Sequence, residues 1–122
     1  MRGLADQIPA ESEPRMPKFL IEASYTSDGI KGVQSAGGSS RRDAIGAMLE
    51  GVGGSLEGFY FGFGDHDAYV IADMPDNESA VAVAIAVNAS GGAVTKTTVL
   101  LTPEEVDAAT NARVAYRAPG VT

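Results

Sequence analysis

Two strand-forming segments joined by a short turn constrain the fold of this chain more than any other feature. Leu56–Phe63 and Ala68–Asp73 are rich in aromatic and β-branched residues, and the Gly64–Asp67 segment between them is short enough for a hairpin. Strands joined in this way lie antiparallel. The sequence therefore predicts a fold built on an antiparallel sheet.

A strand and a helix flank this hairpin on each side. Phe19–Tyr25 alternates apolar and polar residues, and Arg41–Val52 then carries apolar residues at helical spacing. After the hairpin, Glu78–Ala89 predicts a helix and Thr95–Leu101 a β-branched strand. The resulting order predicts an α+β fold of the ferredoxin-like βαββαβ type, with both helices on one face of the sheet.

Local capping signals predict further helical turns. Thr26 is suited to cap a short turn over Asp28–Ala36, and Ser40 stands three residues before Asp43, as in a capping box. Thr102-Pro103-Glu104-Glu105 is the clearest helix start in the chain. It predicts a last short helix over Val106 to about Arg113.

The chain has the length of a single domain. Its 122 residues, 44% of them hydrophobic, are enough to bury a core. Residues 1–16 are polar and contain two prolines, so we expect a flexible N-terminal arm, or one that orders on a neighbouring subunit. We assign residues 17–118 to the ferredoxin-like domain and residues 119–122 to a C-terminal tail.

Composition disfavours several classes of function. The net charge of −7 repels phosphate groups, so we expect no nucleic-acid or membrane partner. The absence of cysteine excludes disulfides, thiolate metal sites and a cysteine nucleophile. No apolar stretch reaches the roughly 20 residues of a membrane helix, and the N-terminus lacks the apolar core of a signal peptide. We therefore expect a cytoplasmic protein.

Alternation along the first strand predicts a face of the sheet that helices leave uncovered. If Phe19, Ile21 and Ala23 meet the helices, the opposite face carries Leu20, Glu22 and Ser24. The fourth strand adds either Lys96, Thr98 and Leu100 or the alternating set Thr95, Thr97 and Val99. The polar residues that we expect to orient a ligand on this face are Glu22, Ser24, Tyr69, Lys96 and Thr98. The alternatives are a structural ion pair and simple exposure.

The only histidine of the chain lies in the hairpin turn, between two aspartates. His66 paired with Asp65 or Asp67 would make a general base, and with one of them a metal ligand pair. An incomplete ligand set argues against a metal. A plain turn, in which glycine supplies positive φ and aspartate bonds the backbone, is the alternative that we favour. His66, Glu22 and Lys96 remain the candidates for catalysis.

Two further segments allow a binding role. Arg41 and Arg42 follow Gly37-Gly38 at a helix start, where an anion can bind. The alternative is a capped helix whose arginines are solvated or pair with Asp43 or Glu50. The helix over Glu78–Ala89 is apolar nearly all round, so it needs cover on more than one side. It is either an ordinary core helix or part of an oligomer interface.

Several segments together resemble the GYD-domain family. They are Met16–Thr26, Gly38–Arg42, Phe59–Gly64 and Lys96–Val106. The resemblance spans roughly residues 16–118. It implies a dimeric α+β barrel of ferredoxin-like subunits, the fold of a superfamily that includes cofactor-free monooxygenases, isomerases, haem enzymes and ligand-binding regulatory domains. The family's eponymous tyrosine corresponds to His66 here, so a role that needs a phenol at that position is in doubt.

The resemblance implies a fold and not a reaction. We expect a homodimer or higher homo-oligomer without a cofactor, which binds a small molecule or serves an accessory or assembly role. The alternative is a cofactor-free enzyme, monooxygenase- or isomerase-like, that acts on a small, partly apolar substrate between the two sheets. A protein partner bound through the N-terminal arm is a third hypothesis.

Overall fold

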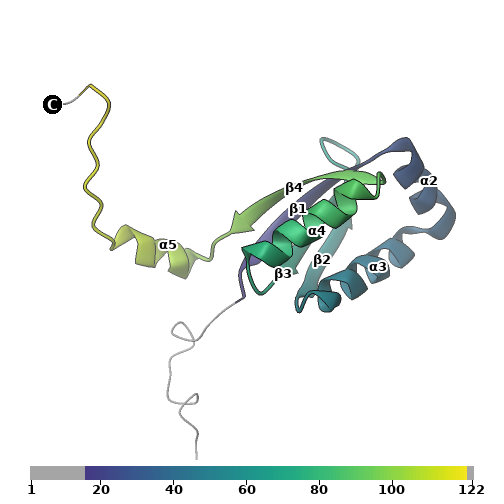
Figure 1. Ribbon diagram of the computed structural model, residues 1–122, viewed down its shortest axis with the longest axis horizontal. Coiled ribbons are helices and arrows are strands. Elements are labelled where there is room, and N and C mark those ends of the chain that lie inside the picture. The colour runs from purple at the N-terminus through teal and green to yellow at the C-terminus, as the bar shows by residue number, and fades with distance from the viewer. Residues whose placement is uncertain (1–15, 121–122) are drawn as a thin grey trace, which may run out of the picture. The chain divides into compact units, whose positions relative to one another are not determined.

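The computed structural model describes residues 16–120, and Figure 1 shows how its strands and helices follow one another. The elements are β1 (Lys18–Tyr25), α2 (Ser27–Ala36), α3 (Gly38–Gly51), β2 (Ser55–Phe61), β3 (Ala68–Asp73), α4 (Asn77–Ala89), β4 (Ala93–Leu100) and α5 (Pro103–Thr110). Each strand and helix predicted from the sequence is present. Several of their ends differ from the prediction.

The four strands form one antiparallel sheet in the order β2-β3-β1-β4. The two central strands, β1 and β3, are far apart in the sequence, and the hairpin β2-β3 lies on one side of β1 with β4 on the other. This is the predicted ferredoxin-like topology of the α+β class. Its register places Glu22 between Tyr69 of β3 and Lys96 of β4.

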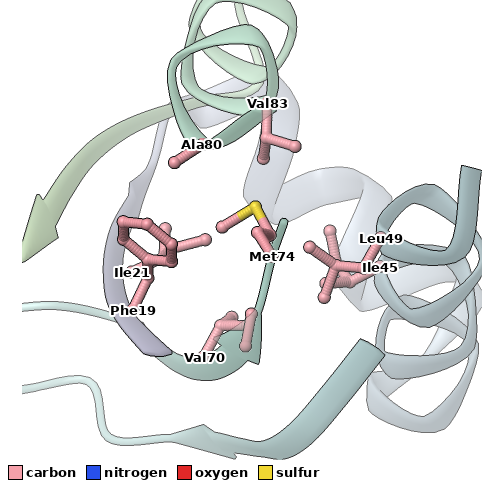
Figure 2. Close-up of a cluster of buried hydrophobic side chains, with 9 residues drawn as sticks. Phe19, Ile21, Ile45, Leu49, Val70, Met74, Ala80 and Val83 are labelled. Atoms are coloured by element: carbon pink, nitrogen blue, oxygen red, sulfur yellow. The ribbon is translucent and has the colours of Figure 1, made fainter. Parts of the chain in front are cut away.

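The core lies between one face of the sheet and helices α3 and α4. Figure 2 shows Met74 in the middle of this cluster, with β1 side chains on one side of it and α3 side chains on the other. The buried members are Phe19, Ile21, Ile45, Leu49, Val70, Ala72, Met74, Ala80 and Val83. Both helices therefore cover the same face, as the pattern predicted.

We call the sheet face turned away from α3 and α4 the distal face. The pairing register and the alternation of side chains assign to it Leu20, Glu22, Ser24, Tyr60, Tyr69, Ile71, Val94, Lys96, Thr98 and Leu100. The register selects the Lys96 set of β4, one of the two alternatives left open by the sequence. The set of Thr95, Thr97 and Val99 lies on the helix face.

The predicted ends of four elements are wrong, and β4 is one of them, since it begins at Ala93 and not at Thr95. β2 ends at Phe61, before Phe63, whose φ of 55° is incompatible with a strand. α3 begins at Gly38 and has Gly37 as its N-cap without a side-chain hydrogen bond, so the predicted capping box at Ser40 does not form. α5 ends at Thr110 and not near Arg113, whereas its predicted start is confirmed by a capping box between Thr102 and Glu105.

α2 is a complete helix that crosses close to the turn before β4. Thr26 caps it by accepting a hydrogen bond from the Gly29 amide, as predicted. Thr26 also donates its hydroxyl proton to the carbonyl oxygen of Gly91, 2.7 Å away. A side chain at Gly29 would collide with the Gly92 carbonyl, because an added Cβ would lie 1.8 Å from that oxygen. Glycine is therefore required at this close approach.

The chain divides into two units, one ending at Leu100 and one that includes α5. α5 buries none of its own side chains. The predicted N-terminal arm, apart from Met16, lies outside the described residues, as do the last two residues of the predicted tail. The domain limits at residues 17 and 118 stay predictions.

Candidate functional site

A polar cluster lies on the distal face where the β2-β3 turn reaches β1. The Nε2 atom of His66 lies 3.4 Å from Oε2 of Glu22, and its Nδ1 atom lies 3.2 Å from the Ser24 hydroxyl oxygen. The Tyr69 ring meets the imidazole edge to face, with 6.1 Å between the ring centres. Three of the residues predicted for the distal face thus converge on the candidate histidine.

The alternation of β1 explains this convergence. Glu22 and Ser24 are two residues apart along the strand, so their side chains lie next to each other on the same face. The hairpin turn brings the imidazole over both side chains. The Glu22 side chain is 18% exposed and that of His66 is 27% exposed, so the pair is partly shielded within a single chain. The His66 imidazole therefore lies between the Glu22 carboxylate and the Ser24 hydroxyl, with one of these groups at each ring nitrogen.

Neither aspartate beside His66 forms a hydrogen bond or an ion pair with the imidazole among the described contacts. Asp67 instead accepts a hydrogen bond from the Tyr25 amide through Oδ2, at 2.8 Å, and its own amide donates to the Ala23 carbonyl. The alternative in which His66 pairs with an adjacent aspartate does not occur among the described contacts, because Glu22 supplies the carboxylate. The predicted structural role of aspartate in the turn is confirmed for Asp67.

The backbone of the turn also differs from the prediction. Phe63, and not a glycine of the turn, adopts the left-handed conformation, with a φ of 55°. Its ring stacks on that of Phe61 at 5.7 Å between centres and is 60% exposed. A bulky residue with this φ is unusual and costs about 1–3 kcal/mol unless its surroundings compensate.

The remaining candidates of the distal face are more accessible. Lys96 and Thr98 are exposed, although Lys96 is the register partner of Glu22 on β4. No described ion pair joins Lys96 to Glu22, so the two residues are neighbours in the strand register and do not form a salt bridge. Thr98 is opposite Leu20 and lies farther from the cluster along the strand.

Sequence reasoning missed a second charged group on β1. Lys18 donates to Asp73 at 2.8 Å and also contacts the carboxylate of Glu57. The hydrogen bond to Asp73, followed by that to Glu57, raises the pKa of the Lys18 amine. A register shift between Leu56 and Gly58 places Glu57 within reach, and such a bulge leaves no signal in the alternation of β2.

The two arginines of the predicted anion site have different surroundings. Arg42 is exposed and pairs with Asp43, with 3.3 Å between Nε and Oδ1, which matches the structural alternative. Arg41 lies in the first turn of α3, is half-buried, and faces the side of the sheet that carries Tyr25. The structure thus gives the two arginines different partners: Arg42 has a carboxylate, whereas Arg41 has no hydrogen bond or ion pair within residues 16–120.

Two features are absent from residues 16–120. No cluster of three or more histidine, aspartate or glutamate side chains in this part of the chain can hold a metal ion. Within the same residues, no helix has both the length and the apolar character needed to cross a bilayer.

The topology and the distal-face cluster define an α+β protein of ferredoxin-like fold with polar groups on its sheet. The GYD domain matches residues 19–110, from the start of β1 to the end of α5. The chain belongs to the GYD domain family, as the resemblance indicated. No curated protein and no solved structure matches the chain.

Proposed function

We propose that the protein is a homodimer that binds a small molecule where the distal faces of two subunits meet. The observation that carries this proposal is the cluster of Glu22, Ser24 and His66 on a face that α3 and α4 leave uncovered. Converging polar groups within a partly apolar wall are the common composition of ligand sites.

Apolar side chains around the cluster support burial against another protein surface. Tyr60 is 67% exposed and Val94 is 65% exposed, and both lie on the distal face with Leu20 and Ile71. Large exposed apolar groups on one face are typical of an interaction site.

A second copy of the chain is the partner that we favour. Twofold dimers are the commonest oligomers, and their interfaces must be self-complementary. The distal face carries acidic Glu22 next to basic Lys96, so it can meet its own copy with opposite charges facing each other. The dimeric barrel that the family resemblance implies uses the same face.

Size-exclusion chromatography with light scattering measures the mass of the protein in solution and so tests whether it is a dimer. Val94→Asp and Tyr60→Asp place charges on the distal face at positions that are exposed in a single chain, so the subunit should still fold. We expect both to shift the mass from dimer to monomer. Val81→Asp on α4, also 55% exposed, is the matched control. A monomeric wild-type protein, or a dimer disrupted by Val81→Asp alone, would contradict the proposal.

Native mass spectrometry tests the ligand. A small molecule held between the sheets should add mass to the wild-type dimer, and Glu22→Gln combined with Lys96→Gln should reduce the bound fraction. A dimer that retains no added mass after gentle purification from the source cells would count against ligand binding and leave an assembly role.

The row of hydroxyl, imidazole and carboxylate favours a second candidate function. A base held by a carboxylate and placed beside a hydroxyl is the arrangement used for general base catalysis. A cofactor-free enzyme would use His66 to move a proton, with Glu22 orienting the ring. Exchange of the α-hydrogens of a small ketone in D2O, followed by NMR, tests this chemistry. His66→Asn should abolish the exchange and Glu22→Gln should slow it; equal rates in all three proteins would exclude it.

The other proposals concern further assembly. α4 buries Ala80 and Val83 but leaves Val81 and Ile85 exposed, so cover by another subunit remains a proposal for a higher oligomer. A protein partner for the N-terminal arm and a cytoplasmic location also remain proposals. Deleting residues 1–15 and measuring the mass of the assembly tests the arm.

A further inference from the structure

A second candidate site lies on the other side of the sheet, inside the subunit. A cavity of about 100 Å³ lies between the sheet and helices α3 and α4, bordered by core residues such as Ile21 and Val83. Its walls come from all four strands, from α2, α3 and α4, and from the turn before β4. It therefore lies entirely within the unit that ends at Leu100 and needs no second subunit to form.

Small side chains create this space. Ala23, Ala68 and Ala93 form a separate buried cluster on the helix face, next to the main core. Ala84 of α4 also lines the cavity. Where larger residues would fill the interior, four alanines leave room, and the wall that they form is apolar.

The polar groups of the cavity differ in whether they already have partners. Thr95 accepts a hydrogen bond from the Asn88 side chain, and Ser90 donates to the Val87 carbonyl. The Tyr25 hydroxyl, the Arg41 guanidinium and the Thr97 hydroxyl also belong to lining residues, and none of these groups has a hydrogen bond or ion pair within residues 16–120. They are the groups left to bind a ligand.

Charge at the cavity favours an anion. Arg41 is the only charged residue that lines it, and its position in the first turn of α3 opposes the helix dipole. Its neighbour Arg42 is neutralised by Asp43, whereas Arg41 is not. A bound anion would compensate both the arginine and the helix terminus.

The pKa of the Tyr25 hydroxyl is consistent with a buried phenol that lies near Arg41. Burial raises the pKa of the Tyr25 hydroxyl, while the nearby Arg41 charge lowers it and that of Asp67 raises it. The phenol therefore keeps its proton near neutral pH and is available as a donor. The opposing effect of Arg41 also shows that its charge lies close to the phenol.

We propose that this cavity binds a small amphipathic monocarboxylate, with its carboxylate at Arg41 and Tyr25 and its apolar part among the alanines. An apolar cavity of about 150 Å³ is known to hold benzene, so this one suits a short alkyl chain or part of one ring. The site is separate from the distal face and does not rest on the proposed dimer.

Titration with hexanoate, hexanamide and acetate tests the proposal, with binding followed by amide NMR shifts of the full-length protein. Hexanoate should bind and shift the amides of cavity residues such as Ala23 and Val83. Hexanamide lacks the charge and acetate lacks the apolar chain, so each should bind about tenfold more weakly or not at all.

Matched variants separate the two halves of the site. Arg41→Gln should weaken hexanoate binding about tenfold, whereas Arg42→Gln should leave it unchanged. Ala84→Leu should fill the cavity and abolish binding, whereas Ala82→Leu, at an exposed position of the same helix, should not. Arg41 is only half-buried and lies on the first turn of α3, so we expect Arg41→Gln to fold. This variant therefore still tests the site if Ala84→Leu does not fold.

Four results would overturn the proposal. Three are the absence of hexanoate shifts at millimolar concentration, equal binding of hexanoate and hexanamide, and equal loss of binding in Arg41→Gln and Arg42→Gln. Shifts confined to distal-face residues such as Glu22 would likewise contradict it and would place the ligand at the proposed dimer site.

Discussion

His66 and Glu22 form the one histidine–carboxylate contact of the described chain, with 3.4 Å between Nε2 and Oε2. The contact joins β1 to the turn between β2 and β3, two segments that are far apart in the sequence. The Ser24 hydroxyl lies at the other ring nitrogen and holds the ring in place.

The first prediction concerns this pair. His66→Asn should lower the free energy of unfolding by less than about 1 kcal/mol, because a partly exposed contact of this kind contributes little. Urea unfolding measures the change. The same substitution in a Glu22→Gln background is the control, where its effect should be smaller because the partner carboxylate is already absent. An equal effect in the two backgrounds would reduce His66 to a part of the turn.

A second prediction concerns the turn itself. Asp67→Ala removes the carboxylate that accepts from the Tyr25 amide, so the free energy of unfolding should fall by about 1.5–3 kcal/mol. Asp65→Ala, at the exposed neighbouring position, is the control and should change it by less than about 0.5 kcal/mol. Denaturant unfolding measures both. Similar losses in the two variants would show that the hydrogen bond of Asp67 is not the anchor of the hairpin.

The third prediction uses two glycines of α2. Gly29→Ala should destabilise the protein strongly, because its Cβ would lie 1.8 Å from the Gly92 carbonyl oxygen. Gly32→Ala meets nothing within 4 Å and should stabilise the same helix by about 0.5–1 kcal/mol. Thermal unfolding compares the melting temperatures of the two variants with that of the wild type. A higher melting temperature for Gly29→Ala would disprove the close packing of α2 against the turn before β4.

A fourth prediction follows from the raised pKa of Tyr25. Burial favours the protonated phenol, so the stability that it contributes is complete below the unfolded value of about 10 and is lost as the pH rises through the higher folded pKa. Tyr25→Phe should therefore flatten the loss of stability above pH 10. Tyr116→Phe, at a position that is 76% exposed, is the control. Identical alkaline profiles for Tyr25→Phe and the wild type would contradict the prediction.

The candidate site was only partly visible in the sequence. The period of two along β1 correctly placed Glu22 and Ser24 on one face, because neighbouring strand residues must point in opposite directions. The same rule could not say which carboxylate would reach His66. That depended on the path of the turn, where Asp67 is drawn to the Tyr25 amide and Phe63 takes the left-handed conformation.

The sequence indicated only one part of the helix-face cavity, the possible anion site at Arg41, and gave no sign of the cavity itself. Ala23, Ala68 and Ala93 are ordinary residues of three separate strands, and Tyr25 and Arg41 belong to different elements. They become one site only after the strands pair and the helices pack. Sequence spacing describes neighbours along one element and contains no information on neighbours across several.

The sequence by itself determined the order of strands and helices, the start of α5 and the face of β1 that enters the core. These features depend on local hydrogen bonding and on the alternation of side chains, which nearby residues decide. The tertiary structure alone decided the register that sets Lys96 beside Glu22, the partner of His66, the bulge that brings Glu57 to Lys18 and the cavity beside Arg41. Each of these arises from packing between segments that are distant in the chain, so its energy is defined only when the whole sheet and its helices have formed.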